Sequence, residues 1–228
     1  MTINLMARGT TAPPLRTGHR RWLLTVPGLA GLGYSLSWIA GLAVPAPSPG
    51  LGASGAEIVA ALSGHGPAVA VQYALTEGLP AAGIALIAVA LSRTARRCGA
   101  TVSARFALVA GLVAAVISAM QFALGLALTA TSAPGPAHLL FASIDRLDGA
   151  KMLALAVLGA AAATMTALPR WLRWTGIALT VAITCSGLVY LLLIAPLAAA
   201  AGPALVLLLA FMTGCGIMTG MTAGRRDR

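Results

Sequence analysis

Charged side chains are scarce in this sequence. They make up 9% of its 228 residues, whereas hydrophobic side chains make up 59%. A typical soluble domain has about 25% charged residues, so this balance excludes an ordinary soluble protein and is typical of a polytopic membrane protein. We therefore expect a single all-α domain that contacts the lipid bilayer.

Cysteine and histidine are also rare, with three of each. Cys98, Cys185 and Cys215 have neither the spacing of a disulfide framework nor that of a zinc site, and we interpret them as small packing residues. His65 and His138 have no partner at metal-ligand spacing. The sequence thus predicts no metal site and no cofactor.

Acidic residues number only five, against fifteen lysines and arginines. The net charge of +10 does not indicate a nucleic-acid partner, because the basic residues bracket apolar runs and so act as topology signals. These few acidic residues also do not form the cluster of carboxylates that binds magnesium. A terpene synthase that ionises a diphosphate is therefore not expected.

Six apolar segments are long enough to cross a bilayer, for which about 20 residues suffice. They predict a six-helix transmembrane bundle over residues 21–223. Residues 1–20 form a basic tail with little to bury, expected to be disordered, and residues 224–228 form a second basic tail. The predicted segments are Trp22–Val44, Pro67–Leu91, Arg105–Ala130, Gly149–Leu168, Trp171–Leu193 and Pro203–Thr222.

The distribution of arginine predicts the orientation of this bundle. Lys and Arg in short loops concentrate on the cytoplasmic side of a membrane. In the predicted topology only Arg146 and Lys151 lie on the opposite side from all the other basic residues. We therefore expect a plasma-membrane protein with both termini in the cytoplasm.

The two longer outer connections are predicted to carry further helical structure. Ser54-Gly55-Ala56-Glu57 is a capping box, so a short interfacial helix should follow it. Pro134-Gly135-Pro136 precedes the stretch 138–152, which is either a second surface helix or an early start of the fourth transmembrane helix. Gly28, Gly31 and Gly33 in the first segment and the Gly216-x-x-x-Gly220 pattern in the sixth indicate close helix packing, which we place within one subunit.

Glu77 is the first candidate functional residue. It lies inside the second apolar segment with no basic residue near it in sequence. An ionisable group at mid-bilayer costs roughly 3 kcal/mol or more, so it usually faces the bundle interior and marks a site. Pro80 has no N–H to donate to the Thr76 carbonyl, which predicts a kink beside the acid. The alternative is a structural hydrogen bond from Glu77 to Gln121 or Tyr34.

Other polar and aromatic residues gather in the outer halves of the predicted helices. Several are four residues apart, as Tyr34 and Trp38 are, and so share a helix face. We expect these faces to converge on an outward cavity, mostly apolar with a few polar groups, as small-molecule sites are. The catalytic candidates are Glu77, Asp145 and Asp148, and the substrate-binding candidates are Tyr34, Trp38, Tyr73, Gln121, Phe122, Phe141 and Tyr190.

The charges near the start of the fourth segment also have a plainer interpretation. Asp145, Asp148 and Lys151 would then be a solvated helix start, with the acids near the positive end of the helix dipole. Asp148 and Lys151 would pair at i,i+3 on its surface. Both interpretations remain open from the sequence.

The small size, the all-helical membrane architecture and the single acid on the second helix resemble the small integral-membrane terpene cyclases of fungal meroterpenoid and actinobacterial indole-terpenoid pathways. The resemblance implies that a carboxylic acid, here Glu77, protonates an alkene or epoxide. The fungal enzymes have seven helices and a second acid on a late helix, whereas the sixth segment here has none. Asp145 or Asp148 would supply it. The chain equally resembles a broad group of six-helix bacterial membrane proteins, which implies no activity.

Two functional hypotheses follow. The first is a metal-independent terpene cyclase whose hydrophobic small-molecule substrate is a linear isoprenoid or a prenylated compound. In it, burial keeps Glu77 protonated and aromatic faces stabilise carbocations. The second is a non-enzymatic protein: a small-molecule or proton-coupled carrier, or an accessory subunit, that uses Glu77 as a proton site.

Overall fold

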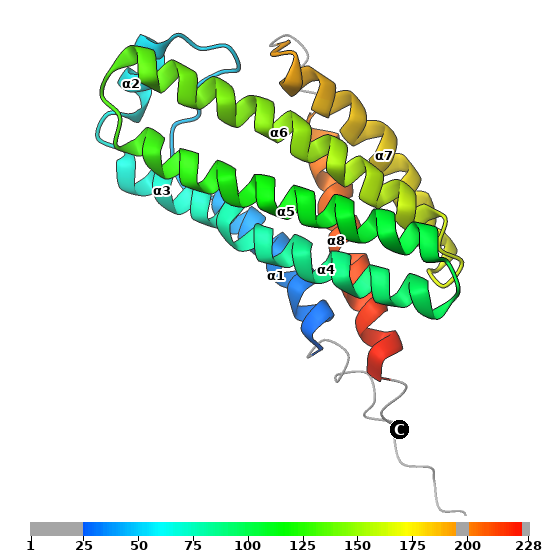
Figure 1. Ribbon diagram of the computed structural model, residues 1–228. Helices are drawn as coiled ribbons and strands as arrows, with labels where there is room; N and C mark the ends of the chain where they lie inside the picture. Colours follow the sequence, from blue (N-terminus) through cyan, green and yellow to red (C-terminus); the bar gives the residue numbers. More distant parts are fainter. Residues whose placement is uncertain (1–24, 195–200, 225–228) are drawn as a thin grey trace, which may run out of the picture.

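The computed structural model describes residues 25–194 and 201–224, which form a helical bundle (Figure 1). The predicted all-α fold is confirmed for these residues. The predicted tail of residues 1–20 and all but Gly224 of the C-terminal tail lie outside them. The elements are α1 (Val26–Leu42), α2 (Gly55–Leu62), α3 (Gly66–Tyr73), the π-helical turn η2 (Ala74–Gly78), α4 (Leu79–Arg97), α5 (Thr101–Thr129), α6 (Pro134–Ala163), α7 (Arg170–Leu191) and α8 (Ala201–Gly224).

Four helical stretches are long and apolar enough to cross a membrane. By length and composition they are Gly66–Arg97, Thr101–Thr129, Arg170–Leu191 and Ala201–Thr222. The outward faces of the bundle are also apolar, with Leu36, Val109, Val181 and Val206 each more than half exposed. Such a surface suits hydrocarbon and not water. The chain is therefore a multi-pass helical membrane protein in contact with lipid.

Each long helix packs against its neighbours in sequence. α5 lies between α4 and α6, α7 lies between α6 and α8, and α1 closes the bundle against α8 and α4. The α4–α5 and α6–α7 turns lie toward the end where α1 begins and α8 ends, and α2 lies at the opposite end (Figure 1). The main core is built largely from alanine, leucine and isoleucine, so the helices approach closely.

Glycine makes two of these helix contacts possible. A Cβ atom on Gly31 would lie 2.7 Å from the Met212 carbonyl oxygen and 3.1 Å from the Gly216 Cα. The predicted close packing within one chain is thus confirmed for Gly31 and Gly216. It is wrong for Gly33, which is exposed on α1 and where an added Cβ would meet no other atom within 4 Å. At the α6–α7 contact, a Cβ on Gly149 would lie 2.6 Å from the Gly187 carbonyl oxygen.

The short helix α2 has the predicted capping box. The Ser54 backbone N–H donates to Glu57 Oε2 over 2.8 Å, and the Glu57 N–H donates back to Ser54 Oγ over 3.3 Å. The Ser54 hydroxyl also donates to Glu57 Oε2 over 2.7 Å, and this hydrogen bond, with that from the Ser54 N–H, holds the pKa of the Glu57 carboxyl below its ordinary value. α2 packs against the start of α6, which begins at Pro134 and runs for 30 residues without a break. The predicted early start of the fourth long helix is therefore confirmed, and no separate surface helix occupies residues 138–152.

The three cysteines differ in their surroundings. Cys215 is buried in α8, as a packing residue should be. Cys98, after α4, and Cys185, on α7, are both exposed. The interpretation as packing residues is therefore wrong for these two, because Cys98 lies in the turn after α4 and Cys185 lies on an outward face of α7.

Candidate functional site

A π-helical turn carries Glu77. Ala74–Gly78 forms this wider turn between α3 and α4, and the Leu79 N–H donates to the Ala74 carbonyl, five residues back. Pro80 follows at once and has no N–H for the Thr76 carbonyl. The disturbance predicted at Pro80 thus takes the form of a π-helical turn, a feature found often at functional sites.

Glu77 is buried against a cation. Lys151 Nζ on α6 lies 2.7 Å from Glu77 Oε1 and 2.8 Å from Oε2, so the ammonium binds both oxygens of the carboxylate. The Ser118 hydroxyl on α5 also donates to Oε2. The glutamate and lysine side chains are only 7% and 6% exposed. The partners of Glu77 are therefore Lys151 and Ser118, and not Gln121 or Tyr34 as the structural alternative expected.

Asp148 completes the ionic cluster. Its Oδ1 lies 2.7 Å from Lys151 Nζ, and its side chain is 20% exposed, more than either partner. The amide of Gln121 on α5 donates to the same oxygen over 3.3 Å and to the Ile144 carbonyl over 3.2 Å. The predicted i,i+3 pairing of Asp148 and Lys151 is confirmed. A solvated helix start is wrong for Lys151, because neighbouring helices cover it.

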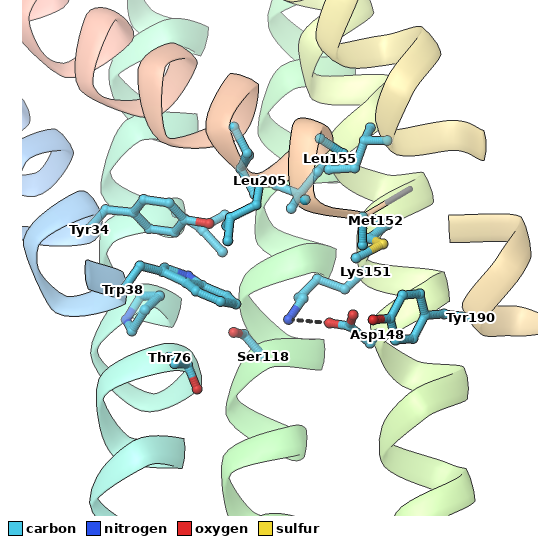
Figure 2. Close-up of a pocket in the computed structure, with 17 residues that line it drawn as sticks. Tyr34, Trp38, Thr76, Ser118, Asp148, Lys151, Met152, Leu155, Tyr190 and Leu205 are labelled. Carbon is cyan, nitrogen blue, oxygen red and sulfur yellow. Dashed lines mark ion pairs between the residues drawn. The ribbon is translucent and has the colours of Figure 1, made fainter. Parts of the chain in front are cut away.

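A cavity of about 190 Å³ adjoins this cluster (Figure 2). Lys151 and Asp148 reach its wall from α6, Tyr34 and Trp38 face it from α1, and Tyr190 faces it from α7. Most of its remaining lining is apolar, from α4, α6, α7 and the first turns of α8. Four of the predicted site residues, Tyr34, Trp38, Asp148 and Tyr190, thus lie together around one cavity.

The other predicted site residues lie outside the cavity wall. Glu77 and Gln121 lie behind it and bind its charged residues. Phe122 faces Gly78, and Tyr73 packs on Gly125. Phe141 belongs to a second apolar cluster near α2. Tyr34, Trp38 and Tyr190 are therefore the predicted substrate-binding residues that line the cavity. The cavity lining does not include Tyr73, Gln121, Phe122 or Phe141.

Asp145 also lies apart from the ionic cluster. It is 9% exposed, and its Oδ2 has no hydrogen-bond partner. Among the described residues, the ion pairs join Lys151 to Glu77 and to Asp148 but none reaches Asp145. No cation therefore compensates a negative charge on this carboxyl group among the described residues.

Sequence reasoning missed two members of the site, Lys151 and Ser118. Lys151 was assigned to the outer surface, although it lies inside the predicted segment Gly149–Leu168. A charge inside a membrane segment usually pairs with another such charge. The search for a counter-ion to Glu77 would have identified Lys151, whereas Ser118 offers no comparable signal.

The charges of the cluster do not cancel. Two carboxylates, Glu77 and Asp148, share the single ammonium of Lys151, so the fully ionised cluster carries a net charge of −1. An uncompensated charge in a low-dielectric bundle is costly. The cluster is therefore suited to binding one more positive charge. No group of three or more His, Cys, Asp or Glu side chains placed to hold a metal ion occurs in residues 25–194 and 201–224.

Comparison of the chain with models of known families, with curated proteins and with solved structures finds no match. The resemblance to membrane terpene cyclases stays a prediction.

Proposed function

We propose that this protein is a proton-coupled carrier of a small molecule, with the Glu77–Lys151–Asp148 cluster as its proton site. The observation that carries the proposal is the sharing of one buried ammonium by two carboxylates. Addition of one proton makes the cluster neutral, which removes the cost of a net charge inside the bilayer. A site that gains by taking up a proton can couple that uptake to the binding of another solute.

The two acids of the cluster differ in their contacts. Glu77 accepts hydrogen bonds from Lys151 and Ser118 through both of its oxygens. Asp148 is more exposed and lies on the cavity wall. Asp148 is therefore the carboxylate that a solute in the cavity meets, and Glu77 holds Lys151 in place.

Proton uptake by the cluster is expected to disappear in Asp148→Asn. The variant leaves Glu77 and Lys151 as a neutral pair, so it should fold and yet bind no additional proton. The measurement is an infrared difference spectrum of the purified protein across a pH titration. The wild type should show a carboxylic-acid C=O band that Asp148→Asn lacks. Glu57→Gln is the matched control, because it removes an exposed carboxylate far from the cluster. An unchanged band in Asp148→Asn would contradict the proposal.

A second candidate function is acid-initiated terpene cyclisation. It is favoured by the position of Asp148, because an acid on a mostly apolar wall with three aromatic side chains resembles what carbocation chemistry needs. In this case the proton of the cluster would start the reaction. Detergent-solubilised wild type incubated with isoprenoids and their terminal epoxides should then yield an isomer of unchanged mass, which Asp148→Asn does not form. Absence of any isomer leaves the carrier.

For the membrane topology, we infer six spans with both termini in the cytoplasm. Four of these spans are the long apolar stretches named above. α1, which is apolar over 17 residues, and α6, which is 30 residues long, can supply the other two. The α4–α5 and α6–α7 turns lie toward the same end of the bundle (Figure 1). Arg96 and Arg97 lie at the first turn, and Arg170 and Arg173 lie at the second. A cytoplasmic location of this end follows the positive-inside rule.

Native Cys98 provides a test of this orientation. It is exposed beside the arginine-rich α4–α5 turn, whereas Ser63 is exposed after α2 at the opposite end. A membrane-impermeant maleimide should label Cys98 only after intact cells are permeabilised. In a Cys98→Ser background, Ser63→Cys should be labelled on intact cells. The opposite pattern would invert the proposed topology.

A further inference from the structure

The cavity beside the cluster combines two features that recognise positive charge. Its wall contains the anionic Asp148 and three aromatic side chains, Tyr34 and Trp38 from α1 and Tyr190 from α7 (Figure 2). The faces of tyrosine and tryptophan attract cations, and quaternary ammonium groups are commonly bound in cages of such rings. The aromatic residues lie on both sides of the cluster, so a ligand in the cavity contacts the rings and the carboxylate together.

The charge of the cluster excludes an anionic ligand. Lys151 is the cation on the cavity wall, but its ammonium already binds Glu77 and Asp148. An anion would add a second uncompensated negative charge to a net charge of −1. A monovalent cation next to Asp148 would instead bring the local charge to zero, as a proton does.

We propose that the cavity binds a small organic cation, an alkylated ammonium, and that this cation and the proton occupy the Asp148 site alternately. This inference rests on the proposed function and names its substrate class. The volume of about 190 Å³ suits a compact ammonium group and not a long chain. The apolar remainder of the lining contacts its alkyl substituents. Alternate occupation makes the coupling an exchange of one proton for one cation.

The competition depends on the groups that face Asp148. Uptake of either positive charge neutralises the same cluster, so each lowers the affinity of the other by the same factor. Binding of the organic cation should therefore weaken as the pH falls and the cluster takes up a proton. The titratable groups around Asp148 are Lys151 and Asp145 on α6, Glu77 on η2, Tyr34 on α1, Tyr73 on α3 and Tyr190 on α7.

The test uses choline and its uncharged isostere 3,3-dimethylbutan-1-ol as probes. They have nearly the same shape, so the difference in their affinities measures the preference for charge. Isothermal titration calorimetry of the purified full-length chain in detergent should show that choline binds at least about tenfold more tightly than the alcohol. Lowering the pH should weaken choline binding by up to roughly tenfold per pH unit and leave the alcohol unaffected.

Three variants locate the binding. Asp148→Asn should reduce choline affinity by at least about tenfold, the loss expected when a buried charge loses its partner. Trp38→Leu, which retains the carboxylate, should reduce choline affinity and not that of the alcohol. Glu57→Gln should change neither, because Glu57 lies on α2 and is fully exposed.

The possible results separate failure of the cation proposal from failure of the proton-coupled carrier. Equal affinity for choline and the alcohol, or choline binding that survives both Asp148→Asn and Trp38→Leu, would overturn the cation proposal. Absence of choline binding while the Asp148 carboxylic-acid band still titrates would overturn it as well, yet leave the proton site intact. Absence of both signals would overturn the proton-coupled carrier too.

Discussion

Replacement of Lys151 by methionine is expected to destabilise the folded protein by about 3–5 kcal/mol. The ammonium is 6% exposed and lies within 2.8 Å of carboxylate oxygens from both Glu77 and Asp148. Its removal leaves two acids facing each other in the bundle without a cation. They must then either bear uncompensated charge or take up protons, and each alternative costs folding free energy. Reversible unfolding in mixed micelles, followed by circular dichroism, measures the loss.

Two matched variants separate the charge effect from the loss of side-chain packing. Lys151→Met combined with Glu77→Gln and Asp148→Asn removes all three charges and should recover most of the stability, because a neutral cluster carries no uncompensated charge. Arg146→Met removes an exposed cation from the same helix and should change stability by less than about 0.5 kcal/mol. A small loss for Lys151→Met alone, or no recovery in the triple variant, would show that the ion pair does not hold these helices.

Gly149→Ala is expected to cost about 1–3 kcal/mol, the usual range for overpacking a close helix contact. The added Cβ would lie 2.6 Å from both the Gly187 carbonyl oxygen and the Leu191 nitrogen, and 3.0 Å from the Leu191 Cα. These are backbone atoms of α7, so α6 and α7 must move apart. Gly149 lies between Asp148 and Lys151 in sequence, and the same movement would disturb the ionic cluster. Unfolding measurements together with the pH titration of Asp148 would detect both effects.

Gly33→Ala is the control for this substitution. A Cβ at Gly33 on α1 meets no other atom within 4 Å. The alanine should therefore be neutral, or stabilise the helix by up to about 1 kcal/mol through its higher helix propensity. Equal effects of the two substitutions would mean that the α6–α7 contact is looser than the structure indicates.

Local signals in the sequence determined the helices. The capping box at Ser54 and Glu57 placed α2 correctly, because its hydrogen bonds join residues three apart. The long apolar stretches were found because spanning hydrocarbon requires them. The start of α6 is ambiguous in the sequence, because Pro134-Gly135-Pro136 allows either a separate surface helix or an early start of the fourth long helix. In the structure α6 starts early, at Pro134, and α2 packs against its beginning.

The sequence by itself determined that Glu77 is special, since an acid in an apolar run carries its cost whatever surrounds it. Only the tertiary structure decided its partner, because Lys151 lies 74 residues away and pairs with it through helix packing. The same packing separated Asp148, on the cavity wall, from Asp145, buried nearby without a cation. Helix periodicity fixes which residues share a face. The cavity, the ion pair and the net charge depend on how the faces of several helices meet, and distance along the chain does not encode that.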